Sequence, residues 1–187
     1  MNTGKLTLTF LLVSLMFISL ISLNQVYADT EEEETTESSA TVSEYLAIDM
    51  STNLTSGILF GNVDPATTNN NATGNNMSGD SQYYITISGD SNINVDLCIK
   101  ANASMSSGLS SIELGNYTWD NSTVASNPAL PGTAIETDYA LSGEGITPGS
   151  NNYYRFWLDI PSTQSAGTYA NTVSFKAVKT GEACQGG

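Results

Sequence analysis

The residue types on which most enzymes depend are scarce in this 187-residue sequence. It contains no histidine, the side chain that most often acts as a general base or a metal ligand near neutral pH. No nucleophile-elbow or phosphate-loop pattern occurs. The acidic residues are scattered along the chain, whereas glycoside hydrolysis needs two carboxylates facing each other in a cleft. The sequence therefore predicts a protein with no enzymatic activity and no cofactor.

Four oxygen-bearing side chains occupy every second position of one short stretch and form a candidate calcium site: Asp90, Asn92, Asn94 and Asp96. Their spacing resembles the first half of an EF-hand loop, but Val95 stands where that loop needs glycine and no glutamate follows at the twelfth position. Alternation along a β-strand explains the same spacing by placing all four on one solvated face. The sequence favours the solvated strand, with calcium binding as the alternative.

The first 28 residues have the layout of a secretory signal peptide. Lys5 precedes an apolar run, residues 6–23, and Val26-Tyr27-Ala28 fits a small-residue cleavage site. We predict cleavage before Asp29 and a secreted protein, extracellular or at the cell surface, that is not attached to the membrane. An uncleaved membrane anchor is the alternative, because an apolar run of this length is long enough to span a bilayer.

The two cysteines, Cys98 and Cys184, belong to a chain that is predicted to reach an oxidising compartment. A disulfide between them would enclose about 86 residues, and the entropy lost by the unfolded chain would be worth roughly 4.5 kcal/mol. We predict this intramolecular bond, which would tie a central strand to the C-terminal end of the domain. Pairing between two chains is the alternative.

Residues 29–40 read DTEEEETTESSA and contain no large apolar side chain. This composition predicts a disordered acidic leader. The whole sequence has 19 acidic and five basic residues, and its formal net charge is −14. Such a charge repels nucleic acids and anionic membranes, which excludes nucleic-acid binding.

Six asparagines lie in N-x-S/T sequons and are candidate glycan acceptors in an exported chain: Asn53, Asn71, Asn76, Asn102, Asn116 and Asn121. Asn71, Asn76 and Asn121 are the better candidates, because the sequence around them reads as loop. Their modification also depends on a host that has the glycosylation machinery.

Tyr153 and Trp157 flank Arg155, the only arginine in the chain, on the polar face of a predicted strand. Exposed aromatic side chains around an arginine are typical of protein interfaces and sugar-binding faces. These three residues are therefore interface or ligand candidates. The alternative, which the residues favour, is that a loop or a neighbouring strand covers this face and Arg155 stacks on its neighbours.

The clearest β pattern lies in residues 152–179, where apolar side chains recur at every second position on both sides of a turn-rich segment, residues 161–167. We predict two antiparallel strands joined as a hairpin or as a corner between two sheets. Their inward side chains should form the core: Tyr154, Phe156, Leu158, Ile160, Val173 and Phe175.

Other segments read as shorter strands: residues 41–51, 57–63, 82–87, 92–101, 112–119 and 135–141. Residues 67–79 read as a long polar loop, and residues 88–91 as a Gly-Asp turn between two strands. About eight or nine short strands without a convincing helix predict an all-β fold. We expect a single antiparallel Greek-key β-sandwich, Ig-like or jelly-roll-like, over residues 41–187, with a closed barrel as the alternative.

Three segments together resemble archaeal secreted surface proteins and, more distantly, the camelysin/TasA group of β-sandwich fibre subunits: FGNVDPA at residues 60–66, NYYRFWLDIP at 152–161 and AGTYANTVSFKAV at 166–178. Ala66 stands where the turn of that group has its last glycine. The resemblance implies self-assembly into extracellular filaments by donor-strand exchange, in which the N-terminal strand of one subunit completes the sheet of the next.

Residues 41–51 fit the donor strand of such an assembly, since they form an apolar-alternating strand on a charged tether. The same strand could fold back into its own domain, which we expect for an isolated chain. The leading hypothesis is a non-enzymatic structural or adhesive protein that binds copies of itself or other cell-surface components. A monomeric carbohydrate-binding module that uses Tyr153 and Trp157 is the alternative.

Overall fold

The computed structural model describes residues 34–185 of the chain. The predicted signal peptide, residues 1–28, and the first residues of the acidic leader, 29–33, lie outside this range. Residues 34–41 are exposed and belong to no helix or strand. From Val42 onward the chain forms one compact unit. Within the described residues, no helix has the length and apolarity needed to cross a bilayer.

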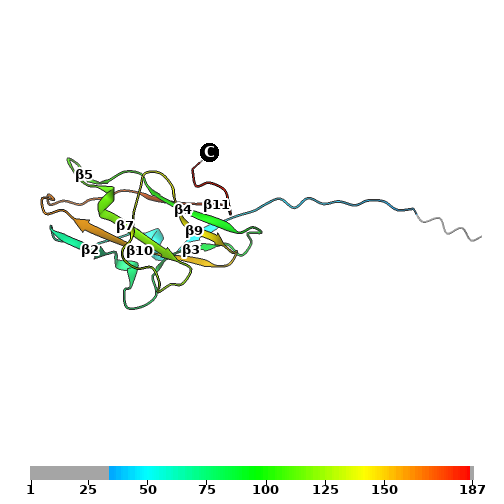
Figure 1. The fold of residues 1–187 in the computed structure, drawn as a ribbon, viewed down its shortest axis with the longest axis horizontal. Coiled ribbons are helices and arrows are strands. Elements are labelled where there is room, and N and C mark those ends of the chain that lie inside the picture. The colour runs from blue at the N-terminus through cyan, green and yellow to red at the C-terminus, as the bar shows by residue number, and fades with distance from the viewer. Residues whose placement is uncertain (1–33, 186–187) are drawn as a thin grey trace, which may run out of the picture. The chain divides into compact units, whose positions relative to one another are not determined.

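The fold is mostly β, and the described residues contain 11 strands in antiparallel sheets together with one short α-helix (Figure 1). The six-stranded sheet has the order β1-β3-β10-β7-β8, and β2 also pairs with β10. Its strands are β1 (Ile48–Met50), β2 (Thr67–Asn71), β3 (Tyr83–Ile87), β7 (Tyr117–Ser122), β8 (Thr133–Ala134) and β10 (Asn151–Ile160).

The second sheet contains three strands in the order β11-β4-β9. These are β4 (Val95–Ala101), β9 (Ala140–Ile146) and β11 (Val173–Lys179), and a separate hairpin joins β5 (Met105–Ser107) to β6 (Ser110–Ile112). The α-helix, α2 (Thr52–Ser56), follows β1 directly, and two 3-10 turns, η1 (Thr73–Asn75) and η2 (Leu114–Asn116), precede β3 and β7.

β10 is the central strand of the six-stranded sheet. β3 pairs with its first half, β2 with its second half, and β7 lies along its other side. The inward side chains of β10 are almost fully buried, as predicted: Tyr154, Phe156, Leu158 and Ile160. Val173 and Phe175 of β11 pack against them, and the rings of Phe175 and Tyr154 meet edge to face at 5.2 Å. Because these two strands lie in different sheets, segment 161–172 is a corner between sheets and not a hairpin.

Several predicted strands were placed wrongly. The predicted strand at residues 112–119 is interrupted by η2, and residues 135–139 of the predicted strand 135–141 lie between β8 and β9. Residues 57–63 are extended but form no strand, because Gly57 and Gly61 adopt positive φ angles of 109° and 69°, which break a regular ladder. Conversely, residues 67–71 of the predicted polar loop form β2, since the second half of β10 offers them backbone partners. The turn at 88–91 does not close a hairpin, because β3 and β4 lie in different sheets.

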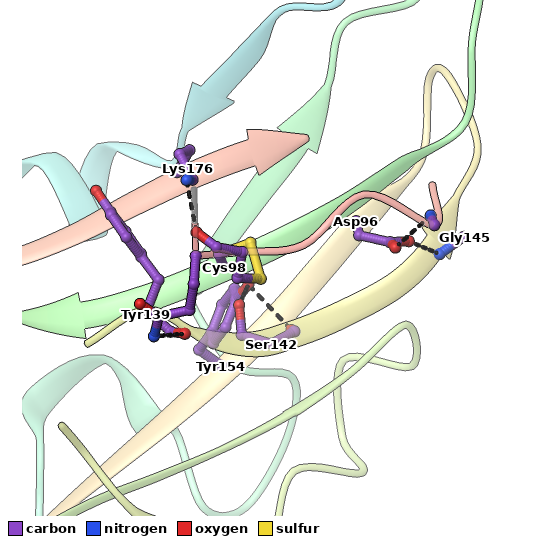
Figure 2. Close-up of a disulfide and its surroundings, with 10 residues drawn as sticks. Asp96, Cys98, Tyr139, Ser142, Gly145, Tyr154 and Lys176 are labelled. Atoms are coloured by element: carbon purple, nitrogen blue, oxygen red, sulfur yellow. Dashed lines mark hydrogen bonds between the residues drawn. A yellow bond between two sulfur atoms is a disulfide. The ribbon is translucent and has the colours of Figure 1, made fainter. Parts of the chain in front are cut away.

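The predicted disulfide between Cys98 and Cys184 is confirmed, and it links two α-carbons 5.8 Å apart across 86 residues of sequence. Figure 2 shows that it fastens the C-terminal segment to β4, near Lys176 and Tyr139. The backbone N–H of Gly181 also donates to the Asp96 carboxylate at 2.9 Å. The C-terminal segment is therefore held on the three-stranded sheet at two points.

Candidate functional site

The N-terminal strand lies at an edge of the six-stranded sheet. In β1, Ile48, Asp49 and Met50 are paired with Ile87, Thr86 and Ile85 of β3. Polar side chains extend this ladder upstream, where Asn92 accepts from the Tyr45 N–H at 2.8 Å and donates to the Ser43 carbonyl at 2.9 Å. The strand that was predicted at residues 41–51 thus folds back onto its own domain, although only its last part is regular β-strand.

Few side chains of this N-terminal segment are buried. Leu46 and Ile48 pack against the core, but Val42 is 82% exposed and Met50 is 49% exposed. Only part of the predicted apolar face of this strand is therefore buried against the core. In contrast, Tyr83, Ile85 and Ile87 of β3 are buried. Backbone pairing, more than apolar burial, holds the N-terminal strand, and its removal would open the edge of a well-packed strand.

Ser51 fixes the point where this strand joins the rest of the domain. Its N–H donates to the Tyr84 carbonyl at 2.9 Å, and its hydroxyl oxygen accepts from the N–H of Leu54 at 3.2 Å, which caps α2. The same hydroxyl donates to the Gln82 carbonyl at 2.9 Å. Ser51 and α2 are therefore fastened to the start of β3 by hydrogen bonds that do not involve the residues before Ser51.

An ion pair joins the N-terminal segment to the three-stranded sheet. Lys179, at the end of β11, donates to Glu44, and this is the one salt bridge among residues 34–185. The hydrogen bond from the Glu44 carboxylate, with its charge, raises the pKa of Lys179 above its ordinary value. Both side chains are about half exposed, so the ion pair adds little stability and mainly orients the N-terminal segment towards the end of β11.

The face around Arg155 is covered, which is the alternative that the sequence favoured. Arg155 is 4% exposed, and its guanidinium donates to five backbone carbonyls, those of Asn75, Asn76, Gly79, Ser126 and Pro128, at 2.6–3.4 Å. These carbonyls belong to two loops, residues 72–82 and 123–132. The arginine therefore fastens two loops over the sheet, and the interpretation of this face as covered is the correct one.

The two aromatic neighbours of Arg155 differ in exposure. Trp157 is 1% exposed, so it cannot serve as a ligand platform, and its indole N–H has no acceptor among the described residues. Tyr153 is half-buried, stands 5.5 Å from the ring of Tyr84, and its hydroxyl accepts from Asn151 at 3.1 Å. Only Tyr153 of the three interface candidates borders open space.

Two hollows lie on the domain surface. The first, of about 440 Å³, is mostly polar and is lined by Tyr153 and by residues that include Thr123, Glu144, Thr147, Ser150 and Asn151. The second, of about 640 Å³, is more apolar and is lined by segment 58–65, the β5–β6 hairpin, segment 164–169, and Leu158 and Ile160 of β10.

The four calcium candidates do not converge on one point. Asn92 holds the N-terminal segment, whereas the two carboxylate oxygens of Asp96 accept from the N–H groups of Gly145, at 2.7 Å, and Gly181. Asp90 and Asn94 are exposed, whereas Asp96 is buried, so the four do not share one solvated face. Within the described chain, no group of three acidic or cysteine side chains is placed to hold a metal ion.

The sequon asparagines differ in their surroundings. Asn71, Asn76 and Asn102 are exposed, whereas Asn53, Asn116 and Asn121 are half-buried. Asn121 lies within β7 and donates to Asn152 at 3.3 Å, and Asn71 is the last residue of β2, so neither is a loop residue as predicted. Asn71 and Asn102 combine exposure with an amide nitrogen that donates to no described residue.

A cluster of two lysines and a tyrosine, on the outer face of the three-stranded sheet, had no signal in the sequence. The ammonium nitrogens of Lys100 and Lys176 lie 4.6 Å and 4.7 Å from the centre of the Tyr139 ring. These residues come from two strands and the segment before β9, which only the folded topology brings together. No protein-family description, curated protein or solved structure matches this chain.

Proposed function

We propose that this chain is a secreted, non-enzymatic structural protein of the cell surface whose copies assemble into filaments by exchanging the N-terminal strand. The observation that supports this most directly is the attachment of that strand. It lies at a sheet edge, is held mainly by backbone hydrogen bonds, and follows the exposed residues 34–41. Its departure would expose the edge of β3, which another copy of the same strand can occupy with identical pairing.

The exchange joins two different surfaces, the donated strand and the accepting edge. Such a head-to-tail contact leaves one donor and one acceptor at the ends of every assembly, so it propagates into an open filament unless the geometry closes a ring. The hinge would lie just before Ser51, whose hydrogen bonds to α2 and to residues 82–84 keep α2 on its own domain.

The finer fold assignment belongs to this proposal. We infer a Greek-key β-sandwich, because the chain alternates between the two larger sheets and, apart from β7 and β8, strands that follow each other in the sequence are not neighbours within either sheet. The likeness to camelysin/TasA-type subunits gains support at Ala66, which adopts φ 61° where those subunits have glycine, the residue that favours this conformation. Export agrees with the Cys98–Cys184 disulfide.

Electron microscopy of two chains tests the assembly. The exported chain from Asp29 should form filaments, and a chain that starts at Ser51, which keeps the cap of α2, should not. Adding a peptide of residues 41–50 to the truncated chain should restore its melting temperature, which circular dichroism measures. A control peptide with asparagine at Leu46 and Ile48 should restore less. Filaments that persist without residues 29–50 would rule out strand exchange.

A second candidate function rests on the polar hollow beside Tyr153. Hydroxyl, amide and carboxylate groups around one half-buried tyrosine suit a saccharide. A monomeric carbohydrate-binding module would show glycan-induced NMR shifts at Tyr153 and Asn151, and Tyr153→Ala would abolish them. Monomeric protein that shifts with glycans favours this candidate, whereas filaments without glycan binding favour the first.

A further inference from the structure

The domain contains two lysines whose charge is not matched by any neighbouring carboxylate. Of the four basic residues in the described range, Arg155 is committed to backbone carbonyls and Lys179 pairs with Glu44. Lys100 and Lys176 remain, and neither has a carboxylate oxygen within 4.0 Å among residues 34–185. This is unusual in a chain whose formal net charge is −14.

The two lysines are held together by the fold. Lys176 of β11 lies opposite Cys98 of β4, and Lys100 lies two residues further along β4. Both ammonium groups approach the ring of Tyr139, which attracts cations through its face. We call these three residues, Lys100, Tyr139 and Lys176, the lysine–tyrosine cluster.

The disulfide fixes the border of this cluster. Cys184 presents its backbone carbonyl to the Lys176 ammonium at 2.6 Å, as Figure 2 shows, and Gln185 donates to the Tyr139 carbonyl at 3.0 Å. The C-terminal segment thus orients both Lys176 and the segment that contains Tyr139. Two half-exposed positive charges near one ring repel each other, and a ligand with closely spaced carboxylates would relieve that repulsion.

The chain itself contains a segment with closely spaced carboxylates. Residues 29–40 hold six acidic residues and no basic residue, and Glu34 and Glu37 are exposed. In an exchanged assembly, the donated strand would bring its Glu44 to Lys179 of the accepting copy. Lys176 lies three residues earlier in β11, about 10 Å away along the strand and, because successive side chains alternate, on the other face of the sheet. Glu37 of the donor's leader precedes Glu44 by seven residues, and an extended chain of that length spans up to about 23 Å, which is enough to reach the lysine–tyrosine cluster of the acceptor.

We propose that the lysine–tyrosine cluster is a docking site for the acidic leader, residues 29–40, of a second copy of this chain. The identification of that copy as the strand donor rests on the proposed function. The positive charge of the cluster attracts the incoming N-terminal segment, and docking neutralises part of the negative charge of the leader within the filament. Because the groups are partly exposed, their attraction should weaken as salt rises.

Zero-length carboxyl–amine cross-linking tests the docking. Unlabelled and ¹⁵N-labelled exported chains are mixed, allowed to assemble, and treated with a carbodiimide, and the linked peptides are identified by mass spectrometry. We expect mixed-isotope links from the leader glutamates to Lys100 and Lys176, with a yield that falls several-fold between 50 mM and 500 mM salt. Links between Glu44 and Lys179 serve as the internal control for the chemistry.

Two variants complete the design. Replacing five glutamates of the leader by glutamine should slow filament growth: Glu31, Glu32, Glu33, Glu34 and Glu37. Lys100→Gln with Lys176→Gln should also slow it. Combining both sets of substitutions should slow growth little more than either set alone. Mixed-isotope Glu44–Lys179 links without leader links would overturn the docking while leaving strand exchange intact. Leader links within single chains only would also overturn it. Absence of all mixed-isotope links, together with absence of filaments, would refute strand exchange as well.

Discussion

The side chain of Asn75 pairs with the backbone of Phe156 as a neighbouring strand would. Its amide nitrogen donates to the Phe156 carbonyl at 2.7 Å, and its amide oxygen accepts from the Phe156 N–H at 2.8 Å. These two bonds lie where β2 has ended and β3 has not yet begun beside β10. One buried asparagine therefore completes the hydrogen bonding of the central strand.

Asn75→Ala should lower the free energy of unfolding by about 1–3 kcal/mol, because it leaves the buried N–H of Phe156 without a partner, while the Phe156 carbonyl keeps only the N–H of Ala72. Asn75→Asp should be no milder, since a carboxylate cannot donate to the Phe156 carbonyl. Urea denaturation measures both. The exposed Asn127 provides the control, and Asn127→Ala should match the wild type. A loss below 0.5 kcal/mol at Asn75 would contradict this role.

Arg155 should be as important to stability as a core residue. Arg155→Lys keeps the charge but has three donors for five carbonyls, so we expect a loss of about 2–3 kcal/mol. The freed loops, residues 72–82 and 123–132, should also lose hydrogen-exchange protection. Lys179→Gln, at the exposed ion pair, is the control and should leave both loops protected. Unchanged exchange in Arg155→Lys would refute the fastening role.

The core could be predicted from the sequence, but the outer face of β10 could not. Period-two alternation in β10 identified Tyr154, Phe156, Leu158 and Ile160, because burial of one strand face is a local pattern. The burial of Arg155 and Trp157 depends on loops from distant parts of the chain. No spacing within β10 reports those loops, so the sequence could favour a covered face but could not identify the segments that cover it.

The candidate site was predictable in part for the same reason. A strand at residues 41–51 is a local pattern, and so is the acidic leader before it. Its edge position and its pairing with β3 depend on sheet order, which the sequence does not encode locally. The lysine–tyrosine cluster depends on three separate segments, and it had no sequence signal at all.

Removal of the disulfide should destabilise the domain and release its C-terminal segment. Replacing Cys98 and Cys184 by alanine opens a loop across 86 residues, which corresponds to a loss of roughly 4.5 kcal/mol. Thermal unfolding, with and without a reductant, measures the loss in the wild type, and the alanine variant should be insensitive to the reductant. A wild-type melting temperature that does not fall on reduction would contradict the prediction.

Two buried tyrosines should make the fold sensitive to high pH. Burial raises the pKa of Tyr154 to about 12, although hydrogen bonds with Ser142 and Asn152 lower it, and burial also raises the pKa of Tyr117. The unfolded chain loses these protons near pH 10, before the folded chain does, so stability is complete below pH 10 and falls as pH rises towards 12.

Tyr154→Phe removes one of these protons together with a buried hydrogen bond to Ser142. It should cost about 1 kcal/mol at pH 7 but show a shallower loss of stability between pH 10 and pH 12. Urea unfolding at several pH values measures both effects, and Tyr117→Phe should flatten the same region. Because the two effects have opposite signs at alkaline pH, the stability curves of the wild type and Tyr154→Phe should converge as pH rises. Parallel curves would show that Tyr154 does not titrate with unfolding.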